Sequence, residues 1–176
     1  AMAIDRRILA ERVLGDGEIP AWGWVPPGVA GYEPARFDWA GWSDEQRLAE
    51  ARRLYREAGY SAERPLSFEL RFNKSPLHDR LAIAVAAMWK ETLGVETRLL
   101  AEEFRVLRHS IDARNVQAFR GSWVADYNDA HSFLQVLEGG FGINLPRYAS
   151  AEYDALLARS RAETDSVARA RLLAEA

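Results

Sequence analysis

The chain has 176 residues, of which 48% are hydrophobic and 28% charged, with a formal net charge of -3. This length is sufficient for a domain with a hydrophobic core, and the composition is typical of a globular protein. The small net charge does not indicate a nucleic-acid or membrane partner, the lack of cysteine excludes disulfides and thiol catalysis, and no apolar run is long enough to span a membrane.

The first predicted helix covers residues 3–14, where Ile4, Ile8 and Val13 follow one another at helical spacing. The sequence opens inside this pattern with no capping residue before it, and it stops inside another helical pattern. No signal peptide is visible. We therefore expect the chain to be a piece of a longer protein.

Residues 18–42 show no periodic pattern and are rich in proline, glycine and tryptophan. A long irregular segment of this kind is usually functional or packed over a core face. Its tryptophans predict an anchor that holds the loop to a sheet, and an aromatic platform for stacking sugars or bases is the alternative. The tryptophans are Trp22, Trp24, Trp39 and Trp42.

The next two elements are a helix and a strand. Ser43 and Gln46 form a capping box, which predicts the start of a helix that ends at Gly59. Residues 66–72 alternate strictly between apolar and polar side chains. This alternation predicts a strand with one buried face and one solvated face.

Helix and strand patterns continue to alternate along the chain. Ser75, followed by proline, caps a helix that ends at Gly94. A strand over 95–101, a helix over 102–114 and a strand over 116–123 follow. This order predicts an α/β fold with parallel strand pairing. The remainder is helical, in segments at 131–137, at 151–163 behind Ser150, and from 166 onward behind Asp165.

The sequence GSWVADYNDA at 121–130 forms the most informative stretch. Asp126 follows an apolar run and lies between Trp123 and Tyr127, so we expect its carboxylate to be partly buried. A buried charge is costly unless it is paired. The internal candidate for a partner is Arg120, and the external one is a bound amine. The simpler alternative is an aspartate that caps a turn by bonding the following backbone.

Other kinds of site find little support. His78, His109 and His131 lack the spacing of metal ligands, and the sequence has no nucleophile-elbow or phosphate-loop motif. Asp126 and Asp129 could serve as the acid and base of a glycosidase. Two aspartates in a turn more often act as hydrogen-bond caps, so we expect no catalytic residue, no metal and no cofactor.

An ordered set of short motifs resembles one known family. The motifs begin at Ala3, Val25, Ala58, Ala86 and Leu93, and continue with the most specific string, WVADYND at 123–129, and SAEYD at 150–154. Together they resemble the C-terminal lobe of family 5 extracellular solute-binding proteins, the oligopeptide- and dipeptide-binding components of ABC importers. The resemblance covers nearly the whole chain.

The resemblance implies an α/β lobe of the periplasmic-binding-protein type 2 kind, with a central mixed sheet flanked by helices. Residues 1–176 would be a single ligand-binding lobe of a two-lobed protein, truncated at both ends. Two lobes of such a protein close over the ligand by a hinge motion. The implied location is periplasmic or extracytoplasmic, either free or held at the membrane by a lipid anchor. The implied partners are a short peptide, the importer's permease subunits and the missing N-terminal lobe, with no nucleic acid.

The same resemblance implies the roles of particular residues. Asp126 would hold the α-amine of a peptide, Trp123 would line a side-chain pocket, and Arg120 would face the peptide's carboxylate end. The backbone of 121–124 would pair with the extended ligand, a form of β-augmentation. The complete set of expected ligand-binding residues is Asp126, Trp123, Arg120, Gly121, Ser122, Val124, Tyr127 and Asn128.

The sequence departs from the family pattern at Phe104, Ile111 and Ala130, where relatives often carry Trp, Arg and Pro. Loss of the arginine removes a candidate partner for a ligand carboxylate, which leaves the preferred peptide length open. Two alternatives also stay open: a receptor of the same architecture for oligosaccharides or other small solutes, and the glycosidase-like enzyme.

Overall fold

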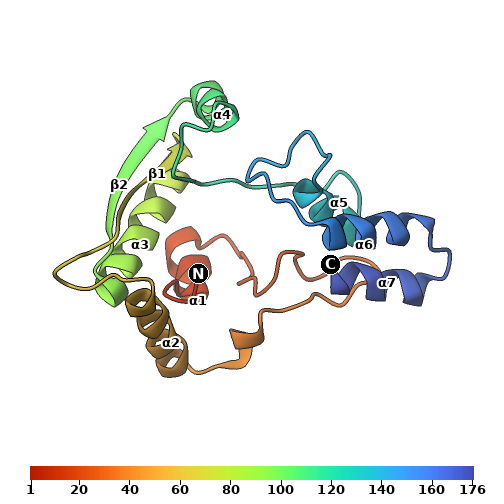
Figure 1. Ribbon diagram of the computed structural model, residues 1–176, viewed down its shortest axis with the longest axis horizontal. Helices are drawn as coiled ribbons and strands as arrows, with labels where there is room; N and C mark the ends of the chain where they lie inside the picture. Colours follow the sequence, from red (N-terminus) through yellow and green to blue (C-terminus); the bar gives the residue numbers. More distant parts are fainter. The chain divides into compact units, whose positions relative to one another are not determined.

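The computed structural model describes all residues from 1 to 176. The chain divides into two compact units, which are described separately (Figure 1). Unit 1 comprises Ala1–Pro20 and Gly41–Gly121, and unit 2 comprises Ala21–Ala40 and Ser122–Ala176. None of the helices has the length and apolar character required to cross a membrane.

Unit 1 is built on a three-stranded parallel sheet with the order β2-β1-β3. The strands are β1 (Ser67–Asn73), β2 (Glu96–Glu102) and β3 (Ala118–Phe119). The α/β class and the parallel pairing are confirmed, and the chain contains no antiparallel pair of the kind that a mixed sheet would add. The central strand β1 pairs along its whole length with β2 but only over two residues with β3.

Helices cover both faces of β1. Its apolar side chains Phe68, Leu70 and Phe72 join Ala82 and Trp89 of α3 (Pro76–Leu93) in one core cluster. The opposite face of β1 lies against α4 (Phe104–Asp112), since Arg71 of β1 donates a hydrogen bond to Ser110 of this helix. As predicted, Ser75 caps α3, and Gly94 ends it in the left-handed conformation.

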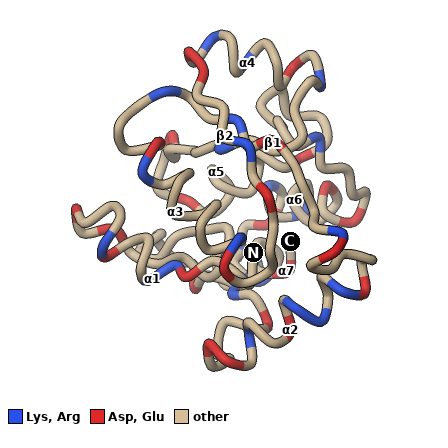
Figure 2. The backbone as a smooth tube through the Cα atoms, turned by 90° about the vertical axis from the view of Figure 1, so that its left-hand side faces the viewer, with Lys and Arg blue, Asp and Glu red and all other residues tan.

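The middle of the polar face of β1 is covered and not solvated, contrary to the predicted half-buried strand, and only Ser67 at its start is exposed. Glu69 is 6% exposed, and its carboxylate receives hydrogen bonds from Arg71 and Arg98. Arg71 also contacts Glu102 at 3.4 Å and Ser110 of α4 at 3.3 Å. Acidic and basic residues follow one another along β1 and β2 (Figure 2). Alternation alone cannot reveal that a second helix covers the polar face, because paired charges tolerate burial.

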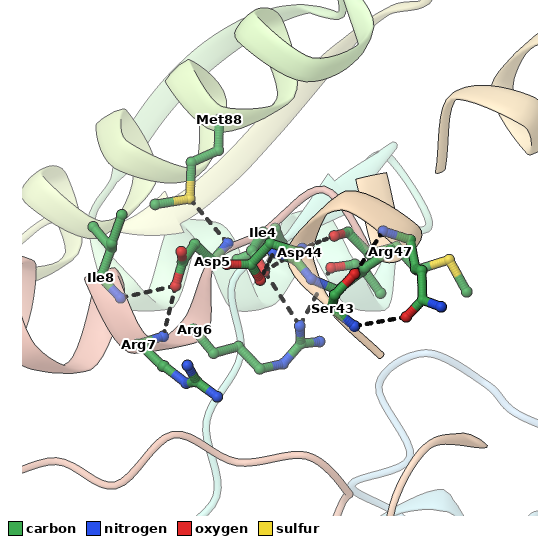
Figure 3. Close-up of polar contacts among 12 residues, drawn as sticks. Ile4, Asp5, Arg6, Arg7, Ile8, Ser43, Asp44, Arg47 and Met88 are labelled. Carbon is green, nitrogen blue, oxygen red and sulfur yellow. Dashed lines mark hydrogen bonds and ion pairs between the residues drawn. The ribbon is translucent and has the colours of Figure 1, made fainter. Parts of the chain in front are cut away.

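The N-terminal segment of unit 1 is a short α1 (Arg6–Ile8) that continues as a π-helix, Leu9–Leu14. The expectation of an uncapped start is wrong, since the carboxylate of Asp5 accepts hydrogen bonds from two N–H groups of the first turn, at 2.9 and 3.0 Å. The N–H of Asp5 also points to the sulfur of Met88 in α3, at 3.4 Å (Figure 3).

Arg47 of α2 (Asp44–Glu57) fixes the same segment from the other side. The predicted capping box at Ser43 is present and starts this helix. Arg47 is 3% exposed and donates to the carbonyl oxygens of Met2 and Ile4 while pairing with Asp44 at 3.0 Å (Figure 3). A buried guanidinium with several acceptors is a well-matched clamp for an irregular backbone.

Unit 2 is helical. Its elements are a 3-10 turn (Asp38–Gly41) at the end of its first segment, α5 (Ala130–Leu134), a second 3-10 turn (Gln135–Leu137), α6 (Ala151–Ala162) and α7 (Ser166–Glu175). The predicted caps Ser150 and Asp165 start α6 and α7. The core of the unit is apolar and is formed by Val25, Val29, Ala130, Leu134, Tyr153, Leu157 and Leu173.

The predicted anchoring of the tryptophan loop to a sheet is wrong, because most of the loop belongs to unit 2, which has no strand. Trp24 donates its indole N–H to the carbonyl oxygen of Phe133 at 2.9 Å. The rings of Trp22 and Trp39 meet edge to face at 5.9 Å, and Phe37 stacks on Trp39 at 4.9 Å. The aromatic residues therefore hold the loop to itself and to α5.

Candidate functional site

The candidate site starts where the sheet ends. The N–H of Arg120 makes the last hydrogen bond of the β1–β3 pair, at 2.8 Å to the carbonyl oxygen of Arg71. The predicted strand over 116–123 is therefore too long. The partner strand β1 ends at Asn73, and the chain then enters α3. The residues after β3 therefore have no strand to pair with.

The backbone of residues 121–125 lies outside any strand, and none of its N–H groups donates a hydrogen bond within the chain. The expected strand character of 121–124 is thus absent from the chain by itself. Backbone N–H and C=O groups are strong hydrogen-bonding groups that folded proteins normally satisfy. This open stretch can accept an added extended chain.

Asp126 lies exposed in a bend of unit 2. Its N–H donates to the hydroxyl of fully buried Ser132 at 3.0 Å, whereas no hydrogen bond or ion pair within the chain engages its carboxylate. The prediction of a partly buried carboxylate is wrong, because the bend leaves the side chain in water, where hydration stabilises the charge without a partner. The hydrogen bond to Ser132 therefore fixes the backbone of Asp126, while its carboxylate has no partner within the chain.

The residues before Asp126 differ in exposure. Arg120 is half-buried in unit 1 with an unpaired side chain, and burial lowers the pKa of its guanidinium. Gly121 and Ser122 are exposed, and Val124 is 84% exposed. Trp123 is half-buried, and its indole N–H is buried without a hydrogen-bond partner, which is uncommon in folded proteins.

Tyr127 contacts α5 of the same unit through His131. The phenol oxygen lies 3.0 Å from Nδ1 of buried His131, and Nε2 of the same ring lies 3.2 Å from a guanidinium nitrogen of Arg161. Arg161 is held in turn by two hydrogen bonds to Glu138, at 2.8 and 2.9 Å. Burial first, and then the charge of Arg161, lower the pKa of His131 below its usual value.

Asp129 and Asn128 have structural partners. Asp129 caps α5 by accepting from the N–H of His131 at 2.8 Å and receives a two-pronged ion pair from Arg169 at 2.7 and 3.0 Å. Burial works to raise the pKa of Asp129, but the hydrogen bonds from Arg169 and from His131 outweigh it and the pKa is lowered. Asn128 accepts from the N–H of Ala30 at 3.1 Å. Since Asp129 is occupied in this way, it does not form an acid and base pair with Asp126.

Sequence reasoning missed the residues that hold this bend in place. These residues lie on helices that follow the bend, at 6, 30 and 40 residues from the groups they contact. They are Ser132, Arg161 and Arg169. The sequence suggests for His131 only the question of a metal ligand, and no group of His, Asp or Glu side chains in the chain has the arrangement of a metal site. Its position two residues after the Asp129 cap is the one local signal that could have indicated its role.

The stability of the protein is expected to fall with acidification because of His131. Its folded-state pKa lies below the usual value of 6.5, so folding favours the neutral ring. The associated stability is fully present above the unfolded pKa and is lost as pH falls through the folded pKa. Denaturant unfolding followed between neutral and mildly acidic pH measures this slope.

The matched variant for this prediction is His131→Asn, which cannot titrate. Its unfolding free energy should lack the acid-dependent decrease that belongs to His131, while the decrease from other groups remains. Identical pH slopes for the two proteins would contradict the role of this histidine in stability.

Residues 1–144 match the family described as bacterial extracellular solute-binding proteins, family 5 Middle. The periplasmic murein peptide-binding protein MppA of Escherichia coli (strain K12) is 39% identical over 169 residues, which are 96% of this chain and 32% of MppA. The probable deoxycholate-binding periplasmic protein YgiS of the same strain is 37% identical over 175 residues, 99% of this chain and 32% of YgiS.

Solved structures agree with this assignment. The crystal structure of Haemophilus influenzae OppA in complex with RPPGFSPFR has a TM-score of 0.93 and 31% identity, over 99% of this chain and 34% of that chain. The chain spans about a third of the length of the curated relatives it matches. The predicted family and its type of α/β fold are confirmed. The chain belongs to the bacterial extracellular solute-binding proteins of family 5, a family of binding proteins and not of enzymes.

Proposed function

We propose that the protein carrying this chain is the substrate-binding component of an ABC importer for peptides. The chain would form one lobe of a two-lobed receptor, which closes over its ligand together with an N-terminal lobe and delivers it to permease subunits outside the cytoplasm. Two relatives support this proposal. MppA is named as a murein peptide-binding protein, and the OppA structure is a complex with the peptide RPPGFSPFR.

The observation that carries the proposal is the free carboxylate of Asp126 beside the open backbone of 121–125. Every peptide offers the complementary groups, an α-ammonium at its start and a regular series of amide donors and acceptors. An ammonium and a carboxylate form a charge-assisted hydrogen bond, which strengthens when a closing cleft removes water. Recognition of the backbone leaves the peptide's side chains free to vary.

The other expected ligand-binding residues have roles that fit an extended peptide. Gly121, Ser122 and Val124 would contribute backbone hydrogen bonds, and Trp123 would flank a side-chain pocket. Arg120 would attract the carboxylate end, since its guanidinium is unpaired and partly desolvated. Tyr127 and Asn128 would complete the surroundings of the amine.

The proposal is tested by calorimetry on the full-length protein with tripeptides and pentapeptides, each with a free and an acetylated N-terminus. A hydrogen bond to a charged group contributes roughly 1.5–3 kcal/mol. Acetylation is therefore expected to weaken binding by roughly 10- to 150-fold. Equal affinities for the free and acetylated peptides would refute an amine anchor.

A different small solute is the second candidate, because YgiS, at 37% identity, is named as a probable deoxycholate-binding protein. Deoxycholate presents a carboxylate and hydroxyl groups but no amine, so it would depend on Arg120 and not on Asp126. Binding of deoxycholate in the same calorimeter, without binding of any peptide, would favour this candidate.

A further inference from the structure

The polar residues around Tyr127 leave only one consistent arrangement of protons. A guanidinium has donors and no acceptor. The nitrogen of Arg161 that lies 3.2 Å from Nε2 of His131 must therefore donate, and Nε2 must accept. His131 is then neutral and carries its proton on Nδ1, because the alternative tautomer would set two N–H groups against each other.

The proton on Nδ1 has one partner within reach, the hydroxyl of Tyr127 at 3.0 Å. The Tyr127 oxygen accepts this hydrogen bond, so its own O–H cannot point back to the ring and is directed elsewhere. Tyr127 is 48% exposed and is the residue after Asp126, so its hydroxyl proton is accessible from solution. No other hydrogen bond within the chain engages this hydroxyl.

We propose that Arg161 and His131 are positioning residues that make the Tyr127 hydroxyl a fixed hydrogen-bond donor to the ligand. The site would thereby require an acceptor oxygen close to the ligand's amine, such as the first carbonyl oxygen of a peptide. This proposal rests on the proposed function and deepens it, because it adds a second recognised group at the same end of the ligand.

The charges around His131 agree with a neutral ring. The positive charges of Arg161 in α6 and Arg169 in α7 lower the pKa of His131. The negative charges of Asp129 and Glu138 work to raise it. Each arginine is already paired with one of these carboxylates, Arg161 with Glu138 and Arg169 with Asp129. The two ion pairs leave no free carboxylate beside the ring to stabilise an imidazolium.

The first test is the tautomer itself. Nuclear magnetic resonance of the full-length protein with nitrogen-15 histidine distinguishes a proton on Nδ1 from one on Nε2, and His131→Asn identifies the signal. We expect the Nδ1–H form at neutral pH, and in Arg161→Ala a shift towards a mixture of both forms. An Nε2–H ring in the unaltered protein, or an unchanged tautomer in Arg161→Ala, would overturn the proposal.

The second test is a matched set of affinities for a free-amine peptide. Tyr127→Phe removes the hydroxyl and is expected to weaken binding about three- to tenfold, the range of one neutral hydrogen bond. His131→Asn places an amide N–H near the position of Nδ1 and should bind within about twofold of the unaltered protein, whereas His131→Gln places its amide nearer Nε2 and should weaken binding as Tyr127→Phe does.

The ligand provides a control that does not depend on folding. A peptide whose first carbonyl is replaced by a thioamide is a weaker acceptor, so it should lose affinity for the unaltered protein and lose none for Tyr127→Phe. Equal losses in both proteins would overturn the donor role of Tyr127. If Asp126→Asn weakens peptide binding while Tyr127→Phe changes nothing, the proposed function stands and this inference fails. If Asp126→Asn has no effect, the proposed function itself is wrong.

Discussion

Replacing Asp126 with asparagine is expected to weaken binding of a free-amine peptide by roughly 2–5 kcal/mol, or about 30-fold to a few thousandfold. The large effect follows because the α-ammonium would be left in a closed cleft without its counter-charge. In the free chain the carboxylate is exposed and unpaired, so its removal breaks no internal contact. The folded structure should therefore be preserved, and the loss should be confined to the ligand.

Calorimetry with two peptides and two proteins isolates this interaction. Asp126→Asn should reduce the affinity for the free-amine peptide and leave that for its acetylated form unchanged, which gives a coupling between the two groups. Asp16→Asn is a suitable control, because Asp16 is another exposed aspartate whose carboxylate has no partner. An equal loss for both peptides would mean that Asp126 acts on the shape of the bend and not on the amine.

Replacing Arg47 with alanine is expected to lower the free energy of unfolding of unit 1 by about 3–5 kcal/mol. The guanidinium is buried, and it satisfies the carbonyl oxygens of Met2 and Ile4 (Figure 3). Its removal leaves these acceptors without their partner and opens a cavity beneath the N-terminal segment. Chemical denaturation, followed by tryptophan fluorescence and by circular dichroism, measures the loss.

The partner in the same ion pair provides the control. The side chain of Asp44 is 72% exposed and that of Arg47 is 4% exposed. Asp44→Ala should therefore cost less than about 1 kcal/mol, as is usual for an exposed member of a surface pair. If the two substitutions had equal effects, the ion pair and not the clamp on the backbone would carry the stability.

The local signals in the sequence predicted most of the elements. Ser43, Ser75, Ser150 and Asp165 each start a helix as expected, because capping depends on a hydroxyl or carboxylate and an N–H group only a few residues apart. The strict alternation of residues 66–72 predicts the strand β1, because a strand with one apolar face has a period of two residues.

The features that the sequence did not predict depend on distant residues. Glu69 is buried because α4 covers the polar face of the sheet, and nothing in residues 66–72 indicates that helix. The aromatic neighbours of Asp126 predict a partly buried carboxylate, whereas the bend directs the residue to water. The tautomer of His131 is set by Arg161, which lies 30 residues further along the chain.

The brevity of β3 has a consequence for aggregation. An edge strand exposes a row of unpaired backbone groups on which a foreign strand can assemble, and natural sheets limit this risk with short or charged edges. At one edge of the sheet, β3 offers only Ala118 and Phe119, followed at once by the charged Arg120, while the longer strand β2 forms the other edge. Extending β3, for example by β-branched substitutions over 116–117, is therefore expected to promote association of copies during refolding.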